Sequence, residues 1–263
     1  MWKYFGILLT LAVVAKNYVA SQEYESRIIG GQEEFITTVP YMVSIRYKKN
    51  ETTPYEHRCS GTIYSANTIL TTATCVIGLD LNRLHIKAGS SFRTQFDGSL
   101  FLVEKYVIHP DFNIWFTDYD LALIKLAFDL TPYPSKEIKA IEIADQLPAA
   151  NRMANVAGWG TTNPDSNTEF SEQIKMAKVV MVEDEICREI YGGSRISEVM
   201  FCAAAATDLE DACYGDAGGA LVYQNKAIGL VSWGRSCGDI KFPGVYTKLV
   251  LFKTWIDNEI SKF

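Results

Sequence analysis

The feature that most constrains the fold is a series of short β-type segments separated by turn-forming residues. Examples are residues 41–45, 68–70 and 100–103, which are rich in β-branched and large apolar side chains. Clusters of Gly, Asn, Asp and Pro interrupt these runs at the spacing expected of strands in an all-β protein. Between Leu249 and Ile260, apolar residues instead recur at steps of three and four, which predicts an amphipathic C-terminal helix.

The cysteine content indicates a protein of an oxidising compartment. The 263 residues include six cysteines, without Cys-x₂-Cys or His-x₃-His spacing. A structural zinc site typically uses such closely spaced ligands, so we expect no metal, and we expect no cofactor either. The six cysteines are instead expected to form three disulfides. The sequence alone does not fix which cysteines pair.

The N-terminus has the pattern of a secretory signal peptide. Trp2 and Lys3 precede an apolar run over residues 5–15, which is too short to cross a bilayer. We therefore expect a signal peptide over residues 1–20, with cleavage after Ala15 or Ala20 both open. Residues 21–27 form a short polar segment without apolar periodicity, which we expect to be an activation pro-segment. These features predict a secreted, extracellular protein.

Charge and composition exclude several partners. The formal net charge of −6 argues against nucleic acid and anionic membranes as ligands, and no later segment is apolar enough to span a bilayer. One glycosylation sequon begins at Asn50, among polar and turn-forming residues that predict an exposed loop.

Several short motifs follow one another along the chain. Residues 213–221 read Cys-Tyr-Gly-Asp-Ala-Gly-Gly-Ala-Leu, residues 70–75 read Leu-Thr-Thr-Ala-Thr-Cys, and residues 120–124 read Asp-Leu-Ala-Leu-Ile. Further motifs are Arg-Ile-Ile-Gly-Gly at 27–31, Gly-Trp-Gly at 158–160, Val-Ser-Trp-Gly at 231–234 and Pro-Gly-Val-Tyr-Thr-Lys at 243–248. In this order they resemble the trypsin-like serine proteases, and the resemblance extends from Arg27 to the C-terminus.

The resemblance implies a fold and a disulfide pattern. We expect an all-β protein of two six-stranded antiparallel Greek-key β-barrels, followed by a C-terminal α-helix. The trypsin-like domain would span residues 28–263, with the first barrel at about 28–135, the second at about 136–248 and the helix at about 249–262. The family pattern implies the pairs Cys59–Cys75, Cys187–Cys202 and Cys213–Cys237.

The residues that match the catalytic triad differ from it at two positions. By resemblance, Thr74 stands in place of the general-base His and Ala217 in place of the nucleophilic Ser, while Asp120 is retained. A methyl group cannot attack a carbonyl, and a threonine hydroxyl does not accept protons near pH 7. None of His57, His85 and His109 stands in a context that predicts a replacement base.

Other parts of the machinery match the family. The backbone N–H groups of Gly215 and Ala217 are expected to form an oxyanion hole, which needs no side chain. Arg27 resembles a trypsin-type cleavage site, and Asp216 matches the acid that receives the new amino group of Ile28. The alternative is that this activation switch is inherited sequence without a present role.

The specificity pocket also matches. Asp211 lies six residues before Ala217, where trypsins carry the acid at the base of the S1 pocket. Gly234 and Gly244 match the small residues of its walls, and Ser232 and Trp233 match its neighbouring strand. This pattern predicts a pocket for Lys or Arg. In the alternative, Arg235 or a reshaped loop closes the pocket.

Three hypotheses of function follow. The leading one is a secreted, monomeric serine protease homolog that is not an enzyme and acts by binding active proteases, protease inhibitors or their substrates. The second is a trypsin-family endopeptidase that cleaves after Arg or Lys with unorthodox groups or residual activity. The third is a secreted ligand-binding or structural protein.

Overall fold

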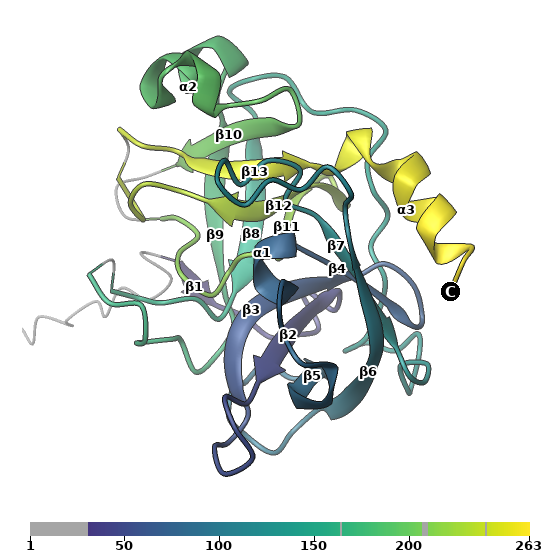
Figure 1. Cartoon of the computed structure of the whole chain (residues 1–263). Helices are drawn as coiled ribbons and strands as arrows, with labels where there is room; N and C mark the ends of the chain where they lie inside the picture. Colours follow the sequence, from purple (N-terminus) through teal and green to yellow (C-terminus); the bar gives the residue numbers. More distant parts are fainter. Residues whose placement is uncertain (1–30, 164, 207–209, 240) are drawn as a thin grey trace, which may run out of the picture.

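The computed structural model describes residues 31–163, 165–206, 210–239 and 241–263. Two barrels lie one above the other, and the C-terminal helix runs along their side (Figure 1). The signal peptide, the pro-segment, Arg27 and Ile28 lie outside the described residues, so their assignments stay predictions. Among the described residues, none of the helices combines the length and apolar character needed to cross a membrane.

The first barrel is a closed ring of six antiparallel strands in the order β2-β3-β4-β7-β6-β5. Their bounds are Met42–Tyr47 (β2), Glu56–Ile63 (β3), Thr68–Thr71 (β4), Leu84–Ala88 (β5), Ser99–Ile108 (β6) and Ala122–Leu126 (β7). Branched aliphatic side chains from these strands fill the interior, including Val43, Ile45, Ile69, Ile86 and Ile124.

The second barrel closes in the same way. Its six strands are Met153–Gly158 (β8), Lys175–Met181 (β9), Met200–Ala205 (β10), Ala220–Tyr223 (β11), Lys226–Trp233 (β12) and Gly244–Lys248 (β13). The order β9-β10-β13-β12-β11-β8 becomes a ring because β8 also pairs with β9, and β1 (Gln32–Glu33) adds to the outer edge of β9. Buried and less buried residues alternate along β9, as the two faces of a strand require.

Short helices and tight turns complete the fold. The helices are α1 (Ala73–Val76), α2 (Asp184–Tyr191) and α3 (Lys253–Ile260), with 3₁₀ turns at Leu81–Arg83, Gly193–Arg195 and Leu249–Leu251. The two residues between β11 and β12, Gln224 and Asn225, both have positive φ (48° and 62°). This is the turn geometry that matches the twist of a two-residue hairpin.

The C-terminal helix joins the barrels. Phe252 and Ile256 are buried in a cluster that also contains Leu70 and Leu123 of the first barrel and Leu230 of the second. The helical spacing seen in the sequence therefore marks the face that packs on both barrels. The expected fold, two six-stranded antiparallel barrels with a C-terminal helix, is confirmed. The exact domain boundaries proposed from the sequence stay predictions.

Candidate functional site

The residues that match the triad come from both barrels and meet between them. Thr74 lies on α1, directly after β4, and Asp120 lies just before β7. Ala217 belongs to the loop that leads into β11, and Ser232 lies on β12. In Figure 1, α1 is drawn between the two barrels. The fold therefore brings together the positions that the sequence motifs indicated.

Asp120 is fully occupied by donors from this chain. Its carboxylate accepts hydrogen bonds from Ser232 Oγ (2.6 Å), the Thr74 backbone N–H (2.9 Å) and Thr74 Oγ1 (3.1 Å). Burial raises the pKa of Asp120 to about 6, although these hydrogen bonds oppose the shift. Thr74 thus satisfies the acid that would orient an imidazole in a Ser-His-Asp triad.

The loop around Ala217 keeps a conformation that leaves two backbone donors free. Gly215 has φ 95°, and the hydrogen bonds of the described residues give neither its N–H nor that of Ala217 an acceptor. The carbonyl groups are occupied instead: Ala217 O accepts from Ser60 N (2.9 Å), and Gly215 O faces His57 Nε2 (3.0 Å). This arrangement is compatible with an oxyanion hole, which needs N–H groups free to bind a developing negative charge.

The three histidines lie outside the pocket lining. His57 is buried, with Nδ1 2.8 Å from Ser44 Oγ and its ring edge-on to Phe170. Burial lowers its pKa to about 3, so the ring is neutral at physiological pH. His85 stacks on Tyr55, and His109 packs among Tyr119, Phe252 and Trp255.

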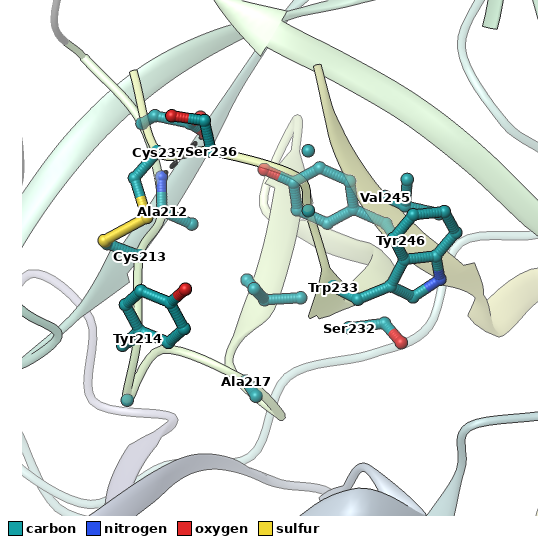
Figure 2. Close-up of a pocket in the computed structure, with 15 residues that line it drawn as sticks. Ala212, Cys213, Tyr214, Ala217, Ser232, Trp233, Ser236, Cys237, Val245 and Tyr246 are labelled. Atoms are coloured by element: carbon teal, nitrogen blue, oxygen red, sulfur yellow. Dashed lines mark hydrogen bonds between the residues drawn. A yellow bond between two sulfur atoms is a disulfide. The ribbon is translucent and has the colours of Figure 1, made fainter. Parts of the chain in front are cut away.

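A pocket of about 240 Å³ opens beside Ala217. Figure 2 shows the Cys213–Cys237 disulfide and Tyr214 on one side, Trp233 and Tyr246 on the other, and Ala217 at one end. The lining also includes Asp211, Ser232, Gly234 and Gly244, which the sequence had assigned to an S1 pocket. Residues from three separate loops and strands thus form one cavity next to the triad positions.

Asp211 supplies the charge of this pocket. Its carboxylate is buried and accepts hydrogen bonds from the backbone N–H groups of Ala212 (2.8 Å) and Gly238 (3.0 Å). Burial raises the pKa of Asp211 to about 6. No cation of the described residues lies within ion-pair distance of it, and a ligand cation would favour its ionised form.

Two glycines keep the pocket open. A Cβ on Gly234 would lie 3.9 Å from the Cα of Gly244, with no heavy atom closer than 3.7 Å, so a side chain there would extend into free space. A Cβ on Gly244 would lie 3.6 Å from a carboxylate oxygen of Asp211. Arg235 stacks over Phe242, 4.3 Å from the ring centroid, and does not line the pocket. The geometry thus favours the open pocket over the alternative in which Arg235 closes it.

Tyr246 lines the pocket as well; it lies in the motif at residues 243–248, but it was not among the residues assigned to the pocket. Its ring is buried, and its hydroxyl has no hydrogen-bond partner among the described residues. A signal was available: Tyr246 lies two residues after Gly244 on β13, and residues two apart share one face of a strand. Val231 and Val245 also line the pocket, in the two motifs that match the family's substrate-binding strand and the end of its specificity pocket, and Ser236 lines it without having been predicted.

Asp216 is buried behind the same loop. Its carboxylate accepts hydrogen bonds from Gly160 N (2.8 Å) and Cys213 N (2.9 Å), and burial raises its pKa to about 7. A Cβ on Gly158 or Gly160 would lie 2.0–2.2 Å from a carboxylate oxygen, so both positions exclude any side chain. The two glycines of the Gly-Trp-Gly motif therefore leave the space that the Asp216 carboxylate occupies.

Three disulfides join Cys59 to Cys75, Cys187 to Cys202 and Cys213 to Cys237. The last one connects two walls of the pocket. Asn50 is exposed, in a loop where its Oδ1 accepts hydrogen bonds from Thr52 and Thr53. Among the described residues, no group of three His, Cys, Asp or Glu side chains is placed to hold a metal ion.

Comparison with known proteins places this chain in a family. The trypsin family model matches residues 28–256. The chain is 35% identical to trypsin eta of Drosophila melanogaster, over 97% of each protein. It is 37% identical to hypodermin-B of Hypoderma lineatum, over 92% of this chain and 90% of that protein. The chain belongs to the trypsin family.

A solved structure supports the same conclusion. Neuropsin, a serine protease expressed in the limbic system of mouse brain, superposes with a TM-score of 0.77 at 25% identity. The match covers 88% of this chain and 98% of neuropsin.

These comparisons contradict the prediction that the chain is not an enzyme. The family match and relatives named trypsin, 35% identical over nearly the whole chain, point to a protease. The prediction rested on two side chains, at positions 74 and 217. Those substitutions leave the barrels, the pocket and the two free N–H groups in place, which are the parts that bind a peptide in a protease. The prediction is corrected accordingly.

Proposed function

We propose that this chain is a secreted member of the trypsin family that binds a Lys or Arg side chain of a protein partner in the pocket above Asp211. The partner is a protein substrate, a protease inhibitor or another protease with such a residue on an exposed loop. The observation that carries this proposal is the buried Asp211 carboxylate in an open pocket of about 240 Å³ between Gly234 and Gly244. A Lys or Arg side chain would place its cation next to this carboxylate, so it matches the charge of the pocket.

Hydrolysis after Lys or Arg is the activity to which the family points. In this chain we propose that it rests on substrate binding and on the N–H groups of Gly215 and Ala217. In a serine protease without its triad these contributions still accelerate the reaction by about 10³–10⁴ over water. We therefore expect slow turnover of a tightly held segment, so that binding dominates the behaviour of the protein.

The same proposal includes maturation. Removal of the signal peptide and cleavage after Arg27 would release the amino group of Ile28, with buried Asp216 as its acceptor. A buried carboxylate gains most from a cation in close, hydrogen-bonded contact, which supports this assignment. We propose further that the mature protein is a monomer and carries a glycan on Asn50.

Thermal unfolding with a benzamidine-type ligand tests the pocket. At a hundred times its dissociation constant, a ligand that binds the folded state alone raises the free energy of unfolding by about 2.7 kcal/mol. We expect this increase in the Arg27-cleaved protein, and we expect Asp211→Ser to abolish it. Glu210→Gln, which changes the adjacent acid outside the pocket lining, is the matched control and should respond like the wild type. A cleaved wild type that is not stabilised by saturating ligand would refute the proposal.

A further inference from the structure

A row of aromatic rings with an arginine at each end lies beside the pocket. Trp233 lines the pocket, and its ring centroid is 5.0 Å from that of Tyr191, which is 6.3 Å from Phe242. The guanidinium of Arg195 lies 4.5 Å from the Trp233 centroid, and that of Arg235 lies 4.3 Å from the Phe242 centroid. We call these five residues the arginine-capped row.

Arg195 is held in place by its surroundings. Gly192, with φ 80°, ends α2, and the 3₁₀ turn Gly193–Arg195 then directs the chain to Arg195. The guanidinium donates a hydrogen bond from Nη1 to the carbonyl of Trp115 at 3.3 Å. A second contact, from Ser197 Oγ to Asp118 (2.6 Å), fixes the loop that carries Trp115. The cation above Trp233 is therefore part of a defined structure.

The charges of the row are not neutralised within the described part of the chain. No carboxylate there lies within 4.0 Å of the guanidinium of Arg195 or Arg235, whereas Arg188 on the neighbouring helix α2 has such a partner in Glu198. Of the nearby acids, Glu198 pairs with Arg188 (2.9 Å), and Asp118 accepts a hydrogen bond from Ser197. Asp211 and Asp239 lie near enough to act on the pKa of Tyr191 in the row, but neither is within ion-pair distance of the two arginines. The row thus carries two arginine side chains without an ion-pair partner among the described residues, on a chain of net charge −6.

A guanidinium stacked on an aromatic ring keeps its edge free. The ring covers one face of the guanidinium, while the remaining N–H groups point along the plane and match a carboxylate. An apolar or aromatic ligand side chain would have to displace Arg195 before it could reach that face of Trp233. The chemistry of the row therefore favours an acidic ligand side chain over an apolar one.

We propose that the arginine-capped row binds an Asp or Glu side chain of the same polypeptide that places a Lys or Arg in the pocket. This inference rests on the proposed function of the pocket. The carbonyl that follows the basic residue would face the N–H groups of Gly215 and Ala217, so the chain leaves on that side. The segment before the basic residue then passes along Ser232 and Trp233, where Arg195 lies. The acidic residue is accordingly on the amino side.

Three fluorescent heptapeptides with one central arginine test this assignment by anisotropy. One has two aspartates on the amino side of the arginine, one has them on the carboxyl side, and one has serines at all these positions. We expect wild type to bind the first about threefold to tenfold more tightly than the other two, as an accessible charge-assisted pair allows. The preference should shrink as ionic strength rises.

Variants of the two arginines test whether the preference for aspartates on the amino side depends on the arginine-capped row. Arg195→Gln should remove most of it, Arg195→Lys should retain part of it, and Arg235→Gln should reduce it to a smaller extent. Arg188→Gln is the matched control, because Arg188 lies on α2 nearby and is already paired with Glu198. A loss of preference in Arg188→Gln as large as in Arg195→Gln would overturn the inference.

Two further outcomes separate this inference from the function of the pocket. If the three peptides bind wild type equally while benzamidine still stabilises it, the row has no such role and the pocket proposal stands. If benzamidine does not stabilise wild type, the pocket proposal fails and the inference fails with it. The comparison of peptides on wild type needs no variant to fold.

Discussion

Asp120 and Asp211, two buried carboxylates of the cleft, are both penalised by burial of their charge but differ in the groups that surround them. Burial raises the pKa of each to about 6. Asp120 is surrounded by donors of this chain, including two side-chain hydroxyls, those of Thr74 and Ser232. Asp211 receives two backbone N–H groups and otherwise faces an open pocket. The hydrogen bonds to Asp120 therefore come from the protein itself, whereas Asp211 faces a pocket in which a ligand can bind.

This difference separates the internal hydrogen bonding of Asp120 from the ligand recognition that we propose for Asp211. Thr74, at the position that by resemblance matches the general base, supplies two hydrogen bonds to Asp120, so no buried acceptor lacks a donor there. The pocket has no comparable substitute cation among the described residues, because Arg235 stacks on Phe242. The cost of burying Asp211 is therefore offset when a basic ligand binds.

Restoring both triad side chains should give the largest effect. The double variant Thr74→His with Ala217→Ser supplies a base next to Asp120 and a hydroxyl next to the free N–H groups. Because triad members act as a unit, we expect hydrolysis of arginyl peptide amides to rise by at least about 10³-fold over wild type. Turnover is measured on Arg27-cleaved protein that is free of other trypsins.

The single variant Ala217→Ser is the control for this experiment. Its hydroxyl still lacks a base, so we expect a rise far below that of the double variant. A double variant no faster than wild type would show that the first-barrel side of the cleft no longer has the geometry of a triad.

Removing the disulfide in the pocket wall should have the next largest effect. Cys213 and Cys237 are 24 residues apart, and the loss of such a loop closure costs about 3 kcal/mol in a chain-entropy treatment. We expect the double variant Cys213→Ala with Cys237→Ala to lose that stability in denaturant unfolding and to lose benzamidine binding as well. Both cysteines line the pocket.

The matched control is the disulfide between Cys187 and Cys202, whose residues do not line the pocket. Its removal should cost a similar free energy of unfolding and leave benzamidine binding in place. Equal loss of binding in both double variants would mean that the pocket depends on the stability of the whole barrel.

Local sequence patterns predicted an all-β protein with a C-terminal helix, whereas the two-barrel fold and the pocket were implied by the resemblance to the trypsin-like family. The apolar spacing around Phe252 and Ile256 predicted α3, and the match of Gly234 and Gly244 to the family's pocket walls implied an opening near Asp211. The contact between Ser232 and Asp120 was not predicted, because it joins residues 112 positions apart on different barrels. Such a contact follows from barrel packing, which no local pattern encodes. The wider error was to infer the absence of enzymatic activity from Thr74 and Ala217 alone.

The pH dependence of stability tests the burial of Asp211. An acid with a folded-state pKa of about 6 and an unfolded value near 3.9 binds its proton more tightly in the folded state. Its contribution to the free energy of unfolding is therefore favourable at low pH and is lost as the pH rises from about 4 to 6. Asp211→Asn has no such carboxylate to ionise. Its free energy of unfolding, relative to that of wild type, should therefore rise by about 2 kcal/mol as the pH increases from 4 to 7.

Denaturant unfolding at several pH values measures this difference. The hydrogen bonds that Asp211 accepts from Ala212 and Gly238 lower its pKa, so their loss is part of the pH-dependent difference that the slope measures. Asp211 also raises the pKa of Asp216, and the variant should lower that pKa slightly. Parallel curves for wild type and variant would indicate that the Asp211 carboxylate is well solvated.

Filling the pocket should give the smallest of these effects. A Cβ on Gly234 meets no heavy atom within 3.7 Å, so Gly234→Val adds its methyl groups to free space and not to packed structure. We expect benzamidine affinity to fall about tenfold, or about 1.4 kcal/mol, while the free energy of unfolding changes by less than about 0.5 kcal/mol. Gly234→Ala should lie between wild type and valine, since it occupies less of the pocket. Titration calorimetry with parallel unfolding curves distinguishes this steric effect from a loss of structure. Unchanged affinity in Gly234→Val would place the basic ligand elsewhere in the cleft, and Asp211 would then resemble Asp120 as a carboxylate served by this chain alone.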